Sequence, residues 1–181
     1  MWAQAQPGLA LDSTWFATRT PWRPLSIAAF DSTSRETSDD VTFELLGIRS
    51  PNGAYTLNVD SYQVIQPDGD TLVVGGEPDS RCSLIDNRSL REATLDFCGT
   101  ACAFNWGVWL TDSAFAVGGW RDADDSGERK QARLSIYSIA DSSVSEYAGP
   151  SVSGQAYRRY LAAWEHWLLM RYRMLKPKRG A

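Results

Sequence analysis

The sequence predicts a mainly β protein: turn-rich antiparallel sheets with one C-terminal amphipathic helix. Three observations support this fold class. Short apolar segments alternate with turns rich in Gly, Pro, Asp and Ser, and one strand–turn–strand pattern occurs twice. After Ser153, apolar residues recur at helical spacing. We expect the strands to form either two or three blade-like units or a sandwich.

The chain is long enough for one buried core. Its 181 residues are 43% hydrophobic and 22% charged, which is typical of a globular protein. We expect an irregular N-terminal arm over residues 1–24, a β domain over 25–150, and a helix with a basic tail over 151–181. The arm contains Pro21 and Pro24, which suit neither a helix nor a central strand.

The first part of the β domain contains one strong hairpin signal. Residues 41–48 and 54–59 are apolar segments on either side of Ser50-Pro51-Asn52-Gly53. Pro fixes φ and Asn-Gly tolerates positive φ, so this tetrapeptide predicts a tight turn between two strands. Residues 25–30 predict a short strand, and 31–40 a polar loop.

The duplicated pattern lies in the middle of the chain. Its first copy is a strand over 62–66, a turn, and a strand over 71–76; its second is a strand over 106–110, a turn, and a strand over 114–119. Each copy ends in a Gly-Gly pair, and the pairs are 43 residues apart. Further strands are expected at 82–86, 90–97, 134–139 and 144–147.

These units resemble blades of β-propellers, in the style of TolB-like and WD40-like repeats, over about residues 42–147. The resemblance implies stacked antiparallel blades. A closed propeller needs at least four blades of about 40 residues each. This chain has room for two or three, so we expect an open set of blades or a sandwich whose edges the helix covers.

The C-terminal helix is predicted from its cap and its period. Ser153 is a favourable N-cap, and Pro177 ends the helix. One apolar stripe is formed by Tyr157, Tyr160, Leu161, Trp164, Trp167, Leu168 and Leu175. Two roles remain open for this stripe: it packs on the protein's own sheet, or it docks on a partner.

The charge is divided unevenly. Residues 153–181 carry +6 of a net charge of −4, which leaves −10 for the rest. An acidic body argues against a nucleic-acid binder, and a basic, Trp-rich helix favours a protein partner or an anionic membrane surface. No run approaches the roughly 20 apolar residues of a membrane span. The candidate interaction residues are Tyr157, Arg158, Trp164, Trp167, Arg171 and Arg173.

We therefore expect a non-catalytic interaction module, such as an accessory subunit of a membrane-associated or extracytoplasmic assembly. The alternative is a module that binds carbohydrate or another small ligand through exposed Trp, with calcium as a candidate ion. Asp122, Asp124 and Ser126 resemble the start of a calcium loop. The twelfth position is Arg133 rather than Glu, so this is no EF-hand, and a solvated loop is the other interpretation.

The cysteines and the N-terminal residues help to predict whether the protein is exported or cytosolic. Cys98 and Cys102 are spaced for a small disulfide loop, although two buried thiols would also fit, and Cys82 is expected in the core. Ala3 and Ala5 resemble a signal-peptidase site, whereas an ordinary flexible start of a cytosolic protein would also show them. We favour an exported, periplasmic protein.

Catalytic motifs are missing from the sequence. The single histidine is His166, and there is no G-x-S-x-G, H-E-x-x-H, phosphate loop or dinucleotide fingerprint. The carboxylate pairs Asp39/Asp40 and Asp68/Asp70 lie in turn-like polar segments, where exposure to solvent is expected. We expect no enzyme activity and no required cofactor.

Overall fold

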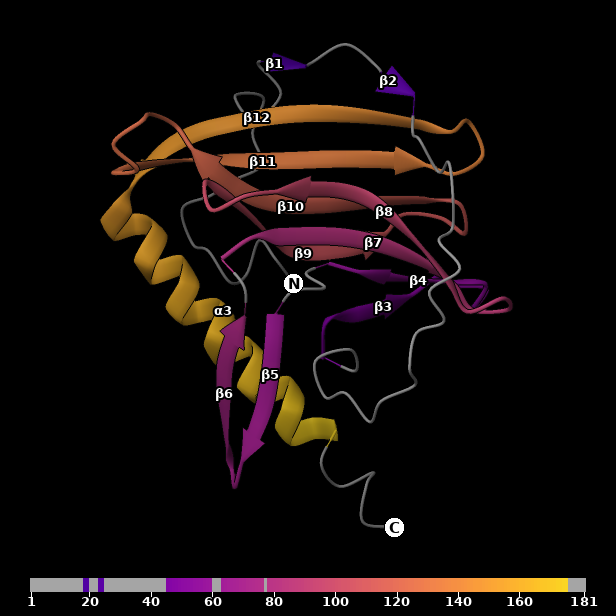
Figure 1. The fold of residues 1–181 in the computed structure, drawn as a ribbon, viewed down its shortest axis with the longest axis horizontal. Helices are drawn as coiled ribbons and strands as arrows, with labels where there is room; N and C mark the ends of the chain where they lie inside the picture. The colour runs from indigo at the N-terminus through magenta and orange to yellow at the C-terminus, as the bar shows by residue number, and fades with distance from the viewer. Residues whose placement is uncertain (1–17, 20–22, 25–44, 60–62, 77, 176–181) are drawn as a thin grey trace.

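The computed structural model describes residues 18–19, 23–24, 45–59, 63–76 and 78–175. It contains three antiparallel sheets and one long helix, α3 (Gly154–Leu175), and no sheet is closed into a barrel (Figure 1). The mainly β fold class with a C-terminal helix is therefore confirmed. The predictions for residues 25–30, 31–40 and Pro177, and the carboxylates Asp39 and Asp40, lie outside the described residues.

The largest sheet has six strands. Its order is β1-β12-β11-β10-β9, with β2 also paired to β12. The strands are β1 (Thr18–Arg19), β2 (Arg23–Pro24), β9 (Cys102–Trp109), β10 (Ala114–Asp122), β11 (Arg129–Ser138) and β12 (Ser143–Ser153). All its pairings are antiparallel.

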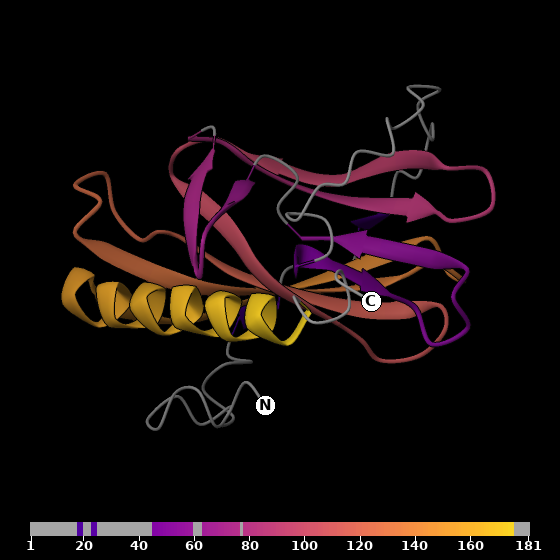
Figure 2. The same cartoon turned by 90° about the horizontal axis from the view of Figure 1, so that it is seen from below.

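A four-stranded sheet, in the order β3-β4-β7-β8, lies over the first (Figures 1 and 2). Its strands are β3 (Gly47–Arg49), β4 (Tyr55–Asn58), β7 (Ser80–Asp86) and β8 (Arg91–Cys98). The predicted turn joins β3 to β4: Gly53 has φ of 73°, and the Ser50 carbonyl accepts from Gly53 N at 2.9 Å. The strand predicted at 41–48 is wrong at Leu45 and Leu46, which are helical.

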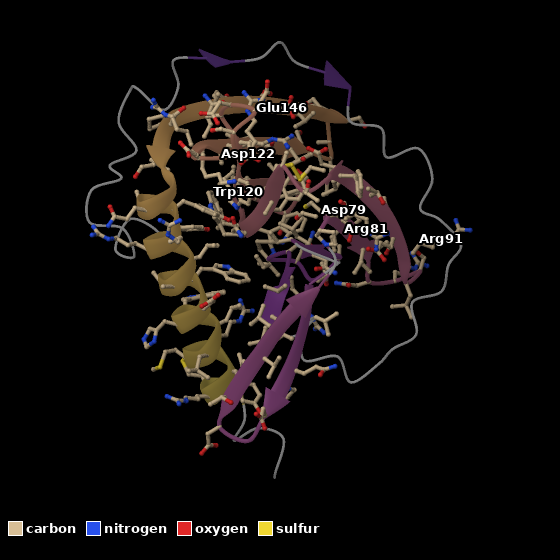
Figure 3. The ribbon with its side chains drawn as sticks, turned by 60° about the vertical axis from the view of Figure 1, so that its left-hand side comes forward. Asp79, Arg81, Arg91, Trp120, Asp122 and Glu146 are labelled. Carbon is tan, nitrogen blue, oxygen red and sulfur yellow. A yellow bond between two sulfur atoms is a disulfide. The ribbon has the colours of Figure 1, made fainter. Side chains whose placement is uncertain are left out.

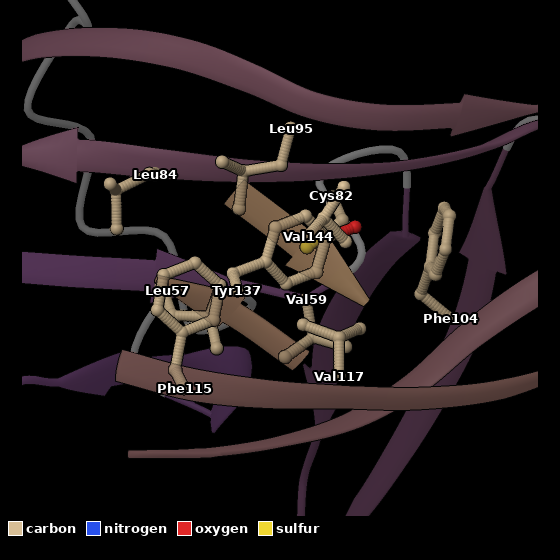
Figure 4. Packing of buried hydrophobic residues seen from close by; sticks show 10 residues of the cluster. All are labelled: Leu57, Val59, Cys82, Leu84, Leu95, Phe104, Phe115, Val117, Tyr137 and Val144. Atoms are coloured by element: carbon tan, nitrogen blue, oxygen red, sulfur yellow. The ribbon is translucent and has the colours of Figure 1, made fainter. Parts of the chain in front are cut away.

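The main core lies between these two sheets (Figure 4). Strand alternation turns one face of each sheet inward, and β-branched and aromatic side chains fill that face. Phe115 and Tyr137 stack with their ring centroids 5.0 Å apart. The other buried members are Leu57, Val59, Cys82, Leu84, Leu95, Phe104, Val117 and Val144.

One arginine, on the interior strand β11 of the larger sheet, links the two sheets. Arg133 on β11 donates to Glu146 on β12 at 2.8 Å and to Asp96 on β8 of the other sheet. Burial disfavours the charged guanidinium, but the two carboxylates outweigh it, so the pKa of Arg133 is raised. The ion pairs are mostly shielded from solvent and link elements distant in sequence.

The two copies of the duplicated pattern have different structures. The first is the hairpin of β5 (Gln63–Asp68) and β6 (Thr71–Gly76), which forms a two-stranded sheet of its own beside α3 (Figure 1). The second is β9 and β10, at one side of the six-stranded sheet. The local resemblance between the copies therefore reflects two hairpins, and not two equivalent blades.

Candidate ligand-binding cleft between the helix and strand β9

Helix α3 begins where the sequence predicts and packs on its own protein. Ser153 Oγ accepts a hydrogen bond from Ala156 N at 3.3 Å, so Ser153 is the N-cap. Leu168 and Tyr172 are buried in a second apolar cluster with Leu45, Leu46 and Ile65. The hairpin β5–β6 lies beside the helix (Figures 1 and 2), and its buried Ile65 packs with Leu168 and Tyr172 in the C-terminal half of α3.

The first turns of the helix lie against β10. The Tyr157 ring meets the Trp120 ring edge-on, with centroids 4.7 Å apart, and Lys130 Nζ lies 4.2 Å from the centre of the Trp120 ring. Burial raises the pKa of both Tyr157 and Tyr160 well above the usual value for tyrosine. Both phenols are therefore held neutral on the sheet side of the helix.

A β-bulge in β9 shapes the surface that faces the middle of α3. Gly118 pairs with Trp106 and Gly119 with Phe104, so Asn105 is the extra residue on β9. The Asn105 carbonyl accepts a hydrogen bond from Trp164 Nε1 at 2.9 Å. The bulge thus ties the helix to the sheet.

The second Gly-Gly pair exists because of this bulge. A Cβ on Gly118 would come within 2.0 Å of the Trp106 indole, and one on Gly119 within 1.9 Å of the Ala103 carbonyl oxygen. Only glycine at these positions lets β9 and the Trp106 ring approach β10 so closely. A Cβ on Gly75, in the first pair, would meet nothing within 4 Å. The two pairs have different roles.

Between α3 and β9 lies a cleft of about 430 Å³. This volume is within the range of small-molecule sites. Its walls are mostly aromatic and aliphatic, and they come from three parts of the chain. The helix contributes Tyr160, Ala163, Trp164, Trp167 and Arg171; β9 contributes Asn105, Trp106, Gly107 and Val108; and the segments around β3 and β4 contribute Leu45, Leu46, Ile48 and Val59.

Among the described residues, Asn105 and Arg171 are the amide and charged side chains that line this cleft. Asn105 is 8% exposed, and its Oδ1 atom is buried and receives no hydrogen bond from the residues that the structure describes. Arg171 is half-buried, and its guanidinium carbon lies 5.4 Å from the centre of the Trp167 ring. Burial lowers the pKa of Arg171, because the charged guanidinium is partly removed from water. The cleft is an apolar site with a few polar groups.

The structure divides the six residues predicted for interaction. Tyr157 and Trp164 contact the protein's own sheet, and Trp164, Trp167 and Arg171 line the cleft. Trp167 is 39% exposed. Arg158 and Arg173 are exposed, and Arg173 Nη2 donates to the Asp70 carbonyl at 3.5 Å. The helical stripe therefore mostly packs on the body.

The predicted calcium ligands are engaged with one another or with Lys130. Asp122, labelled in Figure 3, forms an ion pair with Lys130. Ser126 Oγ donates to Asp124 Oδ1 at 2.6 Å. Among the residues that the structure describes, no three His, Cys, Asp or Glu side chains gather in a way that could hold a metal ion. The other carboxylate pair, Asp68 and Asp70, is exposed at the tip of the hairpin β5–β6.

The arrangement of Cys98 and Cys102 fits the predicted small disulfide loop. The sulfur atoms of Cys98 and Cys102 lie at disulfide distance, with their Cα atoms 5.9 Å apart. Gly99 and Thr100 lie in the short connection that this bond closes between β8 and β9. Cys82 is a buried residue of the main core, as predicted.

Sequence reasoning did not find most of the cleft. Asn105, Trp106, Tyr160 and Ala163 were not among the predicted site residues. The Asn-Trp-Gly run opposite a Gly-Gly pair was the available signal, since glycines in paired strands mark a bulge or a close approach. Leu45 and Leu46 gave no such signal, because any buried contact would select leucine there.

No protein-family model, curated protein or solved structure matches this chain. Within the described part of the chain, no helix has the length and apolar character required to cross a membrane.

Proposed function

We propose that this protein is a non-catalytic binding module that takes a small, mainly apolar ligand in the cleft between α3 and β9. One observation carries the proposal: the cleft is large enough for such a ligand, and its walls are aromatic and aliphatic with a few polar groups. This combination is typical of small-molecule sites. The proposal develops the ligand-binding alternative rather than the docking helix, because most of the helical stripe contacts the protein itself.

The arrangement of the site supports ligand binding in preference to catalysis. Trp106, Tyr160 and Trp164 supply flat apolar surfaces, which bind rings and methylene chains without doing chemistry on them. His166 is exposed on the helix and does not line the cleft. Among the residues that the structure describes, the lining contains no carboxylate, serine or cysteine. These described residues therefore offer binding surfaces and not the usual nucleophiles or general bases.

A fluorescence titration tests the proposal. N-phenyl-1-naphthylamine is a neutral dye that becomes bright in apolar sites, and we expect saturable binding with one dye per chain. Ala163 lines the cleft and is exposed, so Ala163→Trp adds an indole inside it. We expect this variant to weaken dye binding by about tenfold or more, as expected when about 1.4 kcal/mol of contact is lost.

Ala162→Trp is the matched control. Ala162 is the adjacent exposed residue of the same helix and does not line the cleft. We expect it to bind the dye like the unmodified protein. Equal binding by Ala163→Trp and the unmodified protein would contradict the proposed site, as would dye binding that never saturates.

One observation favours protein docking as a second function. Trp167, Met170 and Met174 form an exposed apolar stripe, with 39%, 44% and 66% of their surfaces exposed. They recur at three and four residues, so they share one face of α3. Trp and Met are enriched at protein interfaces. An accessory subunit would dock through this stripe, with exposed Arg173 on the same half of the helix.

The second function has its own test. Met170→Glu and Met174→Glu place charge on exposed positions, so the fold should be unchanged. If the stripe docks on a partner, proteins that co-purify with the full chain will be lost from the double variant. Retention of the same proteins would show that they bind elsewhere.

We further propose an exported location. The disulfide-distance pair Cys98–Cys102 supports it, because such bonds persist in oxidising compartments. Mass measurement of the protein isolated from its native source, with and without reductant, tests this: a gain of two hydrogens on reduction is expected, and an unchanged mass contradicts it.

A further inference from the structure

We infer that the ligand of this cleft is an amphipathic acid: an apolar body with a carboxylate or similar anion at the Arg171 end and a hydrogen-bond donor at the Asn105 end. This inference rests on the proposed function and specifies the chemical class of its ligand. Both polar side chains line the same cleft, and between them the walls are apolar.

Arg171 selects for an anion. Its guanidinium is half-buried beside the Trp167 ring, so its charge is partly desolvated before any ligand arrives. The ring, 5.4 Å away, restricts the guanidinium on one side. A planar fork of N–H donors matches carboxylate, sulfonate and phosphate oxygens. An anion that enters the cleft therefore meets a positioned cation in an environment that strengthens their attraction.

Asn105 selects for a donor. The residue is 8% exposed, and its Oδ1 atom is buried without a hydrogen-bond partner among the described residues. A buried acceptor without a donor costs free energy, so such atoms call for an explanation. Asn105 is the extra residue of the bulge, and its backbone carbonyl already accepts a hydrogen bond from Trp164 Nε1. A hydroxyl or N–H group of a ligand would satisfy the side-chain oxygen.

The helix sets the distance between the two polar sites. Trp164 contacts Asn105, and Arg171 lies seven residues further along α3. Seven residues span about 10 Å along a helix axis. Ala163, Trp164 and Trp167 line the cleft over that interval, so a ligand that meets both sites carries an apolar body of similar length.

Competition against the bound dye tests this class. We would displace N-phenyl-1-naphthylamine from the full chain with 10-hydroxydecanoic acid, with decanoic acid, which lacks the hydroxyl, and with methyl 10-hydroxydecanoate, which lacks the charge. We expect the hydroxy acid to displace the dye at the lowest concentration. Each of the other two should need about tenfold more, since one charge-assisted or buried hydrogen bond is lost.

Arg171→Gln and Arg173→Gln form the matched pair of variants. Arg171 lines the cleft, whereas Arg173 is exposed and contacts only the Asp70 carbonyl among the bonds resolved for it. In Arg171→Gln, we expect the advantage of the acid over the ester to fall from about tenfold to about twofold or less. In Arg173→Gln, the advantage and the affinity for the dye should be unchanged, whereas for Arg171→Gln each competitor is compared with the dye affinity measured for that variant.

The outcomes separate this inference from the function on which it rests. If the dye binds in the cleft but all three competitors displace it equally, or if Arg173→Gln acts like Arg171→Gln, the acid class is wrong and the cleft remains a ligand site. If the dye does not bind, or Ala163→Trp leaves its binding unchanged, the proposed function itself is wrong.

Discussion

The indole of Trp106 lies so close to Gly118 that a Cβ on residue 118 would fall 2.0 Å from Trp106 Cε2. Gly118 is the partner of Trp106 in the β9–β10 ladder, immediately before the bulge at Asn105. Because Gly118 has no side chain, β10 leaves room for the Trp106 indole of the neighbouring strand β9. That side chain forms one wall of the cleft.

Gly118→Ala is predicted to destabilise the protein and to disturb the cleft. The added methyl group must displace the Trp106 ring, and overpacking of this kind typically costs about 1–3 kcal/mol. Chemical denaturation would measure the loss in the free energy of unfolding. A shift in tryptophan emission of the folded state would report the displaced ring.

Gly75→Ala is the control for this prediction. Gly75 belongs to the other Gly-Gly pair, and a Cβ there would meet nothing within 4 Å. We expect its stability to change by less than about 0.5 kcal/mol, as for other surface substitutions. If Gly75→Ala and Gly118→Ala had equal effects, the packing explanation for Gly118 would be wrong.

Leu168→Ala tests whether the helix belongs to the core of its own protein. Leu168 is completely buried against Leu45, Leu46 and Ile65. Removing its side chain is expected to cost about 2–5 kcal/mol in the free energy of unfolding. Met174→Ala, at a position 66% exposed on the same helix, should cost less than about 0.5 kcal/mol. A small effect at both positions would indicate a helix that is not packed on its sheet.

The neutral phenols of Tyr157 and Tyr160 predict a loss of stability at high pH. Burial raises both pKa values above the value near 10 that tyrosine has in an unfolded chain. The folded state therefore keeps these protons where the unfolded state releases them, and stability falls as the pH rises beyond about 10. The double variant Tyr157→Phe/Tyr160→Phe should lose stability less steeply between about pH 10 and 11. Parallel pH profiles for the two proteins would contradict this account.

The bond between Cys98 and Cys102 is predicted to contribute modestly. It closes a very short loop, and the chain-entropy relation gives about 2 kcal/mol for a loop of this size. Denaturation with and without reductant measures the difference. Cys98→Ala/Cys102→Ala should match the reduced protein and show no further response to reductant; a response in that variant would implicate the buried Cys82 instead.

Much of the fold was predictable because it depends on local chemistry. Ser50-Pro51-Asn52-Gly53 specifies its turn within four residues, and Ser153 caps a helix whose period is legible over 22 residues. The strand expected at 41–48 was wrong at Leu45 and Leu46, which are helical. Leucine suits both states, and its burial under α3 depends on residues distant in sequence.

The cleft could not be predicted for the same reason. The cleft is lined by Trp164 of the helix, Asn105 of the bulged strand β9, and Leu45, which lies 60 residues before Asn105 in the sequence. These residues come together only through tertiary packing. The Gly-Gly repeat indicated hairpins but not their partners: Gly118 faces the Trp106 indole, whereas a Cβ on Gly75 would meet nothing within 4 Å. Trp167 and Arg171 are among the predicted interaction residues and both line the cleft; what they bind stays a prediction.

The most direct test of the central claim is an indole N–H spectrum of the ¹⁵N-labelled protein titrated with N-phenyl-1-naphthylamine. Single Trp→Phe variants assign the signals. Trp106, Trp164 and Trp167 line the cleft, whereas Trp109 and Trp120 do not. We expect the first three signals to shift together and saturate at one dye per chain, with Trp120 unchanged. Shifts centred on Trp120, or no shift at Trp106 and Trp164 with the dye bound, would contradict a ligand site between α3 and β9.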